Sequence, residues 1–164
     1  MNITILEMEK CHLLKLWEIL QTYPNYFDDT MGIKTFSDFH KWYKEKVVDG
    51  LVGINKETDE IIGCTYIDEI DNNNGRVNVF MKHEVIPFIE MIELFKKYLN
   101  FFIDKHKLKM LYGVIRVENK ACLRLLKCLN FKIIPEVLVA YEYVNNKPIN
   151  CLISTYIPLL KQME

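Results

Sequence analysis

The chain has 164 residues and a formal net charge of -1, with 50% hydrophobic and 26% charged residues. This length and composition are typical of one well-packed domain, which we expect to span residues 1–164. The balanced charge, without a run of five like charges, argues against a nucleic-acid partner.

The N-terminus carries no basic region followed by an apolar stretch, and the sequence has no apolar window of about 18 residues. We therefore expect no secretion signal and no membrane partner, and we expect a cytoplasmic protein. The cysteines form no CxxC pair and the histidines form no HxxxH or HExxH motif, so we expect reduced thiols and no metal. These cysteines are Cys11, Cys64, Cys122, Cys128 and Cys151.

A strand and two helices are predicted for the first third of the chain. Ile3 and Ile5 alternate as in a strand, and large side chains then recur at the spacing of one helix face. These are Leu13, Leu16, Trp17 and Leu20. Thr35 predicts the N-cap of a second helix, with Asp38 in its first turn and an end by Gly50.

Three antiparallel strands are predicted next. Residues 51–54 and 61–67 alternate with a period of two around the polar segment 55–60, which is typical of a hairpin. A third strand, 76–81, places Val77, Val79 and Met81 on one side and Arg76, Asn78 and Phe80 on the other. Asn74-Gly75 predicts the turn before it, because both residues tolerate positive φ.

The longest predicted helix runs from about Pro87 to His106, where apolar side chains form a stripe at helical spacing. An apolar strand at 110–117 and a short helix at 119–129 follow. Strands 133–143 and 149–156, separated by a turn at 145–148, form a terminal hairpin.

This order predicts an α/β (α+β) fold with a mixed, mostly antiparallel central sheet flanked by helices. The long helix lies between the fourth and fifth strands. Because a helical crossover makes the strands that it joins parallel, 76–81 and 110–117 are predicted to be parallel neighbours.

Segment 117–131, with the sequence VENKACLRLLKCLNF, carries a family resemblance. It resembles the motif N-x-x-A-x-x-x-Y-x-K-x-G-F that follows the fifth strand in the GNAT (general N-acetyltransferase) superfamily. The match lies in its length and at its ends, Asn119 and Phe131, whereas Cys122 and Cys128 replace alanine and lysine. The order of helices and strands resembles the GNAT fold from end to end.

The resemblance implies a role for several residues of this segment. Asn119 falls on the asparagine that contacts the pantetheine arm of coenzyme A. Leu126 replaces a frequent tyrosine that protonates the departing thiolate, although the branch that modifies ribosomal proteins and protein N-termini often has an apolar residue here. Asn130 replaces a glycine in left-handed geometry, which asparagine tolerates.

A second family motif, the pyrophosphate loop R/Q-x-x-G-x-G/A, falls on residues 86–91. This window contains neither glycine nor a basic residue, and Glu84 and Glu90 add negative charge where phosphates would bind. The resemblance implies that the pyrophosphate lies against this segment. The implied cofactor-binding residues are Phe88, Ile89, Glu90 and Met91.

The resemblance implies an acetyl-CoA-dependent N-acetyltransferase that moves an acetyl group to a primary amine of a small molecule or protein by direct attack on the thioester. Acetyl-CoA would be the co-substrate, and its pantetheine arm would bond to the backbone of Val79, Phe80 and Met81. Glu69 is the predicted catalytic base, with Asp68 and His83 as alternatives. These carboxylates could instead only solvate a strand end.

The acceptor amine does not follow from the sequence, and neither does the oligomeric state. Aromatic residues near the first helices either line the acceptor site or form the edge of the core. These are Trp17, Tyr23, Tyr26 and Phe27. Because the phosphate loop lacks its glycines, the alternative function is a GNAT-fold binding or assembly module without catalysis.

Overall fold

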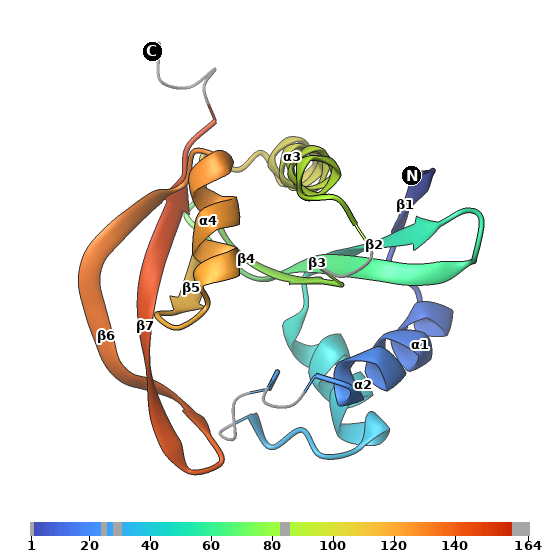
Figure 1. The fold of residues 1–164 in the computed structure, drawn as a ribbon, viewed down its shortest axis with the longest axis horizontal. Helices are drawn as coiled ribbons and strands as arrows, with labels where there is room; N and C mark the ends of the chain where they lie inside the picture. Colours follow the sequence, from blue (N-terminus) through green and yellow to red (C-terminus); the bar gives the residue numbers. More distant parts are fainter. Residues whose placement is uncertain (1, 24–25, 28–30, 83–85, 159–164) are drawn as a thin grey trace.

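The computed structural model describes residues 2–23, 26–27, 31–82 and 86–158. In these ranges the chain forms one seven-stranded sheet, in the order β1-β2-β3-β4-β5-β7-β6, and four helices (Figure 1). The strands are β1 (Ile3–Glu7), β2 (Asp49–Asn55), β3 (Glu60–Asp71), β4 (Asn74–Met81), β5 (Met110–Arg116), β6 (Lys132–Val144) and β7 (Lys147–Tyr156). The helices are α1 (Lys10–Gln21), α2 (Phe36–Lys46), α3 (Phe88–His106) and α4 (Lys120–Cys128).

The helices cover both faces of the sheet, with α1 and α2 on one face and α3 and α4 on the other (Figure 1). Each face has its own core. Tyr98 and Phe102 of α3 are fully buried in the first core, and Leu16 of α1 and Phe39 of α2 lie in the second. The predicted mixed, mostly antiparallel sheet flanked by helices is confirmed. None of the helices in the described ranges is long and apolar enough to cross a membrane.

Local sequence signals set the ends of the helices. Thr35 caps α2, because its hydroxyl oxygen accepts a hydrogen bond from the Asp38 N–H at 3.2 Å while the Asp38 carboxylate accepts one from the Thr35 N–H at 2.9 Å. This reciprocal pair satisfies two backbone donors that a helix start otherwise leaves open. The predicted cap is confirmed.

The relation of β4 to β5 also follows the prediction. The two strands are parallel neighbours, joined by α3. They pair only from Asn74 with Met110 to Arg76 with Tyr112. In the described part of both strands the ladder ends there, and the strands diverge.

The turn between β3 and β4 lies earlier than predicted. Asn72 and Asn73 form it, with φ of 48° and 63°, and Asn74 and Gly75 already belong to β4. The prediction of a turn at Asn74-Gly75 is therefore wrong, because the preceding asparagines supply both positive φ angles that a two-residue hairpin turn needs. Gly75 has a packing role instead, since a Cβ there would lie 2.8 Å from Cδ1 of Leu108.

We expect Phe102→Ala to lower the free energy of unfolding by about 3 to 5 kcal/mol, because it leaves a cavity in the core under α3. Urea unfolding at 25 °C measures the change. Lys97→Ala is the matched control on the exposed side of the same helix and should change stability by no more than about 0.5 kcal/mol. Equal effects of the two substitutions would contradict this packing.

Candidate active site

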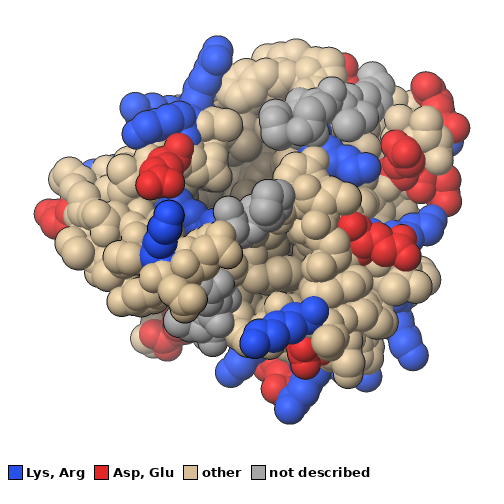
Figure 2. Space-filling view, turned by 60° about the horizontal axis from the view of Figure 1, so that its bottom comes forward, with Lys and Arg blue, Asp and Glu red and all other residues tan. Residues whose placement is uncertain are grey.

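A cavity of about 680 Å³ lies where β4 and β5 diverge. It reaches both faces of the sheet. Toward α3 and α4 its lining includes Phe95, Cys122, Leu126 and Phe131. Toward α1 and α2 its lining includes Tyr26, Phe27, Met31, Trp42, Lys46, Tyr66, Asp68, Arg76, Asn78, Tyr141 and Glu142. Figure 2 shows a hollow on the lower face, with uncharged residues over most of its visible floor.

The backbone of β4 is open to this cavity along one edge. The Lys82 N–H donates to the Ile62 carbonyl at 2.9 Å, so the backbone groups of Lys82 face β3. Backbone groups alternate in direction along a strand, so those of Val79 and Met81 face away from β3. Because the β4–β5 ladder has ended by this point, this edge can accept hydrogen bonds from, and donate them to, an extended ligand.

Gly113 of β5 lies at the fork between the diverging strands. A Cβ at this position would lie 3.2 Å from the Val77 carbonyl oxygen and 3.6 Å from the Ser154 hydroxyl. The Ser154 hydroxyl in turn donates to the Gly113 carbonyl at 3.3 Å. The lack of a side chain at Gly113 therefore keeps the narrow end of the cavity open.

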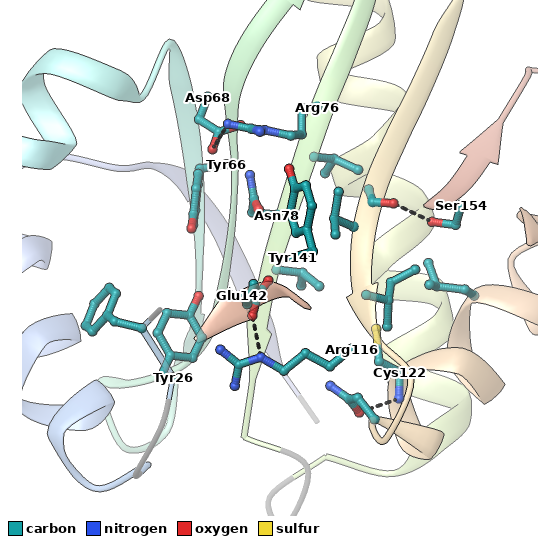
Figure 3. Close-up of a pocket in the computed structure, with 18 of the residues that line it drawn as sticks. Tyr26, Tyr66, Asp68, Arg76, Asn78, Arg116, Cys122, Tyr141, Glu142 and Ser154 are labelled. Atoms are coloured by element: carbon teal, nitrogen blue, oxygen red, sulfur yellow. Dashed lines mark hydrogen bonds and ion pairs between the residues drawn. The ribbon is translucent and has the colours of Figure 1, made fainter. Parts of the chain in front are cut away.

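Two arginine–carboxylate pairs lie in the cavity wall (Figure 3). Arg76 donates two hydrogen bonds to Asp68, of 2.8 and 3.1 Å, and the Asp68 side chain is only 11% exposed. Arg116 of β5 donates to Glu142 of β6. The first pair is bidentate and both are partly buried, so they hold their partners in place more firmly than surface ion pairs do.

Glu142 reaches the cavity through a bulge in β6. Between the pairs Leu138–Cys151 and Glu142–Ile149, β6 advances four residues while β7 advances two. Ala140 in this bulge has φ of 52°, and its N–H donates to the Asn150 side-chain oxygen at 3.0 Å. The bulge brings the adjacent Tyr141 and Glu142 into the lining (Figure 3).

The hydroxyls of Tyr26 and Tyr66 meet across the cavity wall. Burial, with a smaller contribution from the neighbouring tyrosine, raises the pKa of Tyr26 well above its ordinary value. Burial likewise raises the pKa of Tyr66. Both hydroxyls are therefore neutral at pH 7. Near them, the Nδ2 of Asn78 is buried without a hydrogen-bond partner among the described residues.

The start of α4 forms another part of the lining. Asn119 is the N-cap, and its side-chain oxygen accepts a hydrogen bond from the Cys122 N–H at 3.0 Å. Burial raises the pKa of the Cys122 thiol to about 11, so it is neutral at pH 7. Asn130, after α4, has φ of 62°, which confirms the left-handed geometry predicted for it.

The predicted base Glu69 lies outside the described cavity lining, whereas Asp68 belongs to it. The Glu69 carboxylate lies 3.6 Å from Arg76 and is 49% exposed. Desolvation, and then a hydrogen bond to Glu69, raises the pKa of Tyr112 to about 12. The alternative base His83 lies outside the described residues, as does Glu84.

The predicted cofactor-binding residues lie in different surroundings. Val79 and Asn119 line the cavity. The side chain of Phe80 packs in the core between the sheet and helices α1 and α2. The side chain of Met81 packs against the core on the other face, under α3 and α4. In the first turn of α3, Ile89 is 64% exposed, Met91 is buried, and Phe88 lies under the guanidinium of Arg124 at 4.9 Å. Glu90 is partly buried.

Among the aromatic residues expected near the acceptor, Tyr26 and Phe27 line the cavity. Trp17 instead stacks on Phe39 at 5.6 Å, and Tyr23 meets the edge of Phe80 at 5.0 Å. In the described part of the chain, no group of three or more His, Cys, Asp or Glu side chains could hold a metal ion.

The sequence did not predict most of the polar and charged side chains that line the cavity. It did not assign Arg76, Asn78, Arg116, Tyr141 or Glu142 to the site. A signal was present for the first three, because polar side chains interrupt strands that otherwise read as central and apolar. The last two depend on the bulge in β6, for which the sequence carried no comparable signal.

We expect Asn119→Ala to lower the free energy of unfolding by about 0.5 to 2 kcal/mol, because α4 loses its N-cap. Asn119→Asp is the matched control, since its carboxylate can accept the same bond from the Cys122 N–H. Urea unfolding of both variants measures the difference. An alanine variant as stable as the unaltered chain would show that the cap contributes nothing.

A scan with family models finds no match to the sequence, and a search of curated proteins finds none either. Solved structures do match. A ribosomal-protein-S5-alanine acetyltransferase from Vibrio fischeri superposes with a TM-score of 0.77 at 12% identity, over 96% of this chain and 93% of that one. A chimera of the spermidine N-acetyltransferase SpeG from Vibrio cholerae and hSSAT gives 0.78 at 14% identity, over 96% of both chains. The chain therefore has the GNAT acetyltransferase fold that its sequence predicted.

Proposed function

We propose that this chain is an acetyl-CoA-dependent N-acetyltransferase that acts on a primary amine. The observation that carries the proposal is the cavity between β4 and β5, which passes from one face of the sheet to the other. A cofactor arm can enter such a passage from the α3/α4 side and an acceptor from the α1/α2 side. The two solved structures described above are named as acetyltransferases, one of them as a spermidine N-acetyltransferase, which supports the same class of reaction.

The residues present fit an extended pantetheine arm. The open edge of β4 offers the backbone groups of Val79 and Met81, and Gly113 leaves room at the fork. Asn119 and Leu126 line the opposite wall. We propose that this edge binds the arm as an added strand would, with Phe80 in the same segment facing the core behind it.

The phosphates need a positive charge, and residues 86–91 contain no basic side chain. The exposed Arg124 of α4 lies over the ring of Phe88, at the first turn of α3. We propose that Arg124 contributes this charge together with the N-terminus of α3, which attracts anions. A glycine loop binds phosphates through its exposed backbone N–H groups. Here the phosphates would instead lie beside the side chains of Phe88, Ile89, Glu90 and Met91.

When bound, acetyl-CoA supplies an activated acetyl group. The chain's own residues position the amine, stabilise negative charge on the carbonyl oxygen and accept a proton. A β4 backbone N–H such as that of Val79 is the proposed donor to that oxygen, a role worth about 2.7 to 4 kcal/mol in other enzymes.

Glu69 remains our proposed base. Since it lies beside the cavity rather than in its lining, it would accept the proton through water. Glu69→Gln should lower kcat and leave the Kd for acetyl-CoA unchanged, because it removes the proton acceptor without altering the cofactor side. Asp68→Asn is the neighbouring variant, and a loss of kcat in Asp68→Asn alone would assign the base to Asp68.

We expect acetyl-CoA to bind in calorimetry and to be consumed with an amine acceptor. Gly113→Val should weaken acetyl-CoA binding at least tenfold, because its side chain fills the fork. Ala121→Val adds the same side chain at an exposed position of α4 and should leave binding unchanged. Melting curves verify that both variants are folded.

An absence of heat and of thermal shift with millimolar acetyl-CoA would overturn this proposal. The GNAT-fold binding or assembly module without catalysis would then be the better assignment. Binding that Gly113→Val leaves unchanged would place the ligand elsewhere on the chain.

We expect Arg124→Ala to weaken acetyl-CoA binding about tenfold at low salt, or about 1.4 kcal/mol. The loss should shrink at high salt, because ions screen an exposed charge. Arg124→Lys should retain much of the affinity, and Lys127→Ala on the same helix is the control. A loss equal at both salt concentrations would argue against a charge interaction with the phosphates.

A further inference from the structure

The wall of the cavity toward α1 and α2 is formed by aromatic side chains from separate segments of the chain. These are Tyr26, Phe27, Trp42, Tyr66 and Tyr141. Several of these rings pack against one another. Trp42 meets Tyr66 edge to face with centroids 5.5 Å apart, and Tyr26 meets Phe27 in the same way at 5.0 Å. Phe27 also contacts Trp42, at 6.4 Å. Such a wall is preformed, so a ligand that binds there does not have to order it.

Tyr141 adds a ring from the opposite side of the cavity. It lies on β6, across the cavity from Tyr66, and its ring stands near Asn78 (Figure 3). Tyr141 is 47% exposed. A flat group between these walls could meet aromatic surface on both sides, in the stacked or edge-to-face arrangements that aromatic rings favour.

The charges of the cavity argue against an acceptor with several ammonium groups. In the described lining the carboxylates are Asp68 and Glu142, and each is bonded to an arginine. The same lining contains Lys46, Arg76 and Arg116. A second ammonium would meet these cations without a carboxylate of its own, and a charge removed from water without a partner is costly.

Resting on the proposed N-acetyltransferase function, we propose that the acceptor is a primary amine with a flat aromatic body and no second cationic group. Trp42, Tyr66 and Tyr141 bind its ring, and its nitrogen points toward the fork between β4 and β5. The amine nitrogen forms a bond to the acetyl carbon, the carbon–sulfur bond breaks, and the products are an amide and a thiol. The proton lost by the nitrogen balances the one gained by the sulfur.

The test compares 2-phenylethylamine with spermidine, which carries several cationic groups. Calorimetry measures the binding of each amine with and without acetyl-CoA, and thiol release measures its acetylation. We expect 2-phenylethylamine to bind at least tenfold more tightly than spermidine and to have the higher kcat/KM. Tyr141→Ala should raise the Kd for 2-phenylethylamine at least fivefold while the Kd for acetyl-CoA stays the same.

Tyr143→Ala, two residues further along β6 and outside the described lining, is the matched control and should leave both affinities unchanged. Trp42→Phe keeps an aromatic ring in place and should retain most of the binding. Because Trp42→Phe keeps the ring contact, it distinguishes an effect of losing that contact from an effect of unfolding.

Two results would overturn this inference even if acetyl-CoA binds. One is that spermidine binds more tightly than 2-phenylethylamine, and the other is that Tyr141→Ala leaves the Kd for 2-phenylethylamine unchanged. Failure of acetyl-CoA to bind would overturn the proposed function and the role of the amine as an acetyl acceptor. The preference of the cavity for 2-phenylethylamine over spermidine would still be tested, because amine binding is measured without acetyl-CoA as well. If 2-phenylethylamine binds at least tenfold more tightly than spermidine but no thiol is released, the result supports an aromatic binding site and counts against catalysis.

Discussion

The site depends on the early end of the parallel ladder between β4 and β5. After Arg76 and Tyr112 the two strands no longer pair, and the backbone edge of β4 is left facing a cavity. Side chains of α3 and α4, such as Phe95 and Leu126, line this cavity on one face of the sheet, and Trp42 of α2 lines it on the other. Gly113 then keeps the fork itself clear.

Different kinds of groups line the two ends of this cavity. Backbone groups of β4 and Asn119 lie on the side where we propose that a cofactor arm binds, whereas aromatic rings and ion pairs lie on the side proposed for the acceptor. Both carboxylates of the described lining, Asp68 and Glu142, are held by arginines from β4 and β5. The same two strands that form the fork therefore also carry the arginines that pair with the carboxylates of the cavity wall.

The sequence predicted the fold well because most of its signals are local. Helical spacing identified α3, the Thr35 cap marked the start of α2, and the position of Asn130 predicted its left-handed backbone. The site was predicted less well, because its members meet through long-range contacts. Arg116 and Glu142 pair across 26 positions of the sequence, and their contact requires Ala140 in an unusual conformation. The turn at Asn72-Asn73 was missed because the next dipeptide, Asn74-Gly75, carries the same signal.

The bulges of β6 have a consequence for how related chains could diverge. Between Ile133 and Val137, and again between Leu138 and Glu142, β6 contains two more residues than the β7 segment opposite, and normal pairing resumes after each bulge. Insertions or deletions confined to the second bulge would reshape the cavity wall that contains Tyr141 and Glu142, while leaving the β5–β7 ladder in register. If this wall binds the acceptor, as we propose, related chains could change their substrate through the length of β6, without any substitution in β4 or β5.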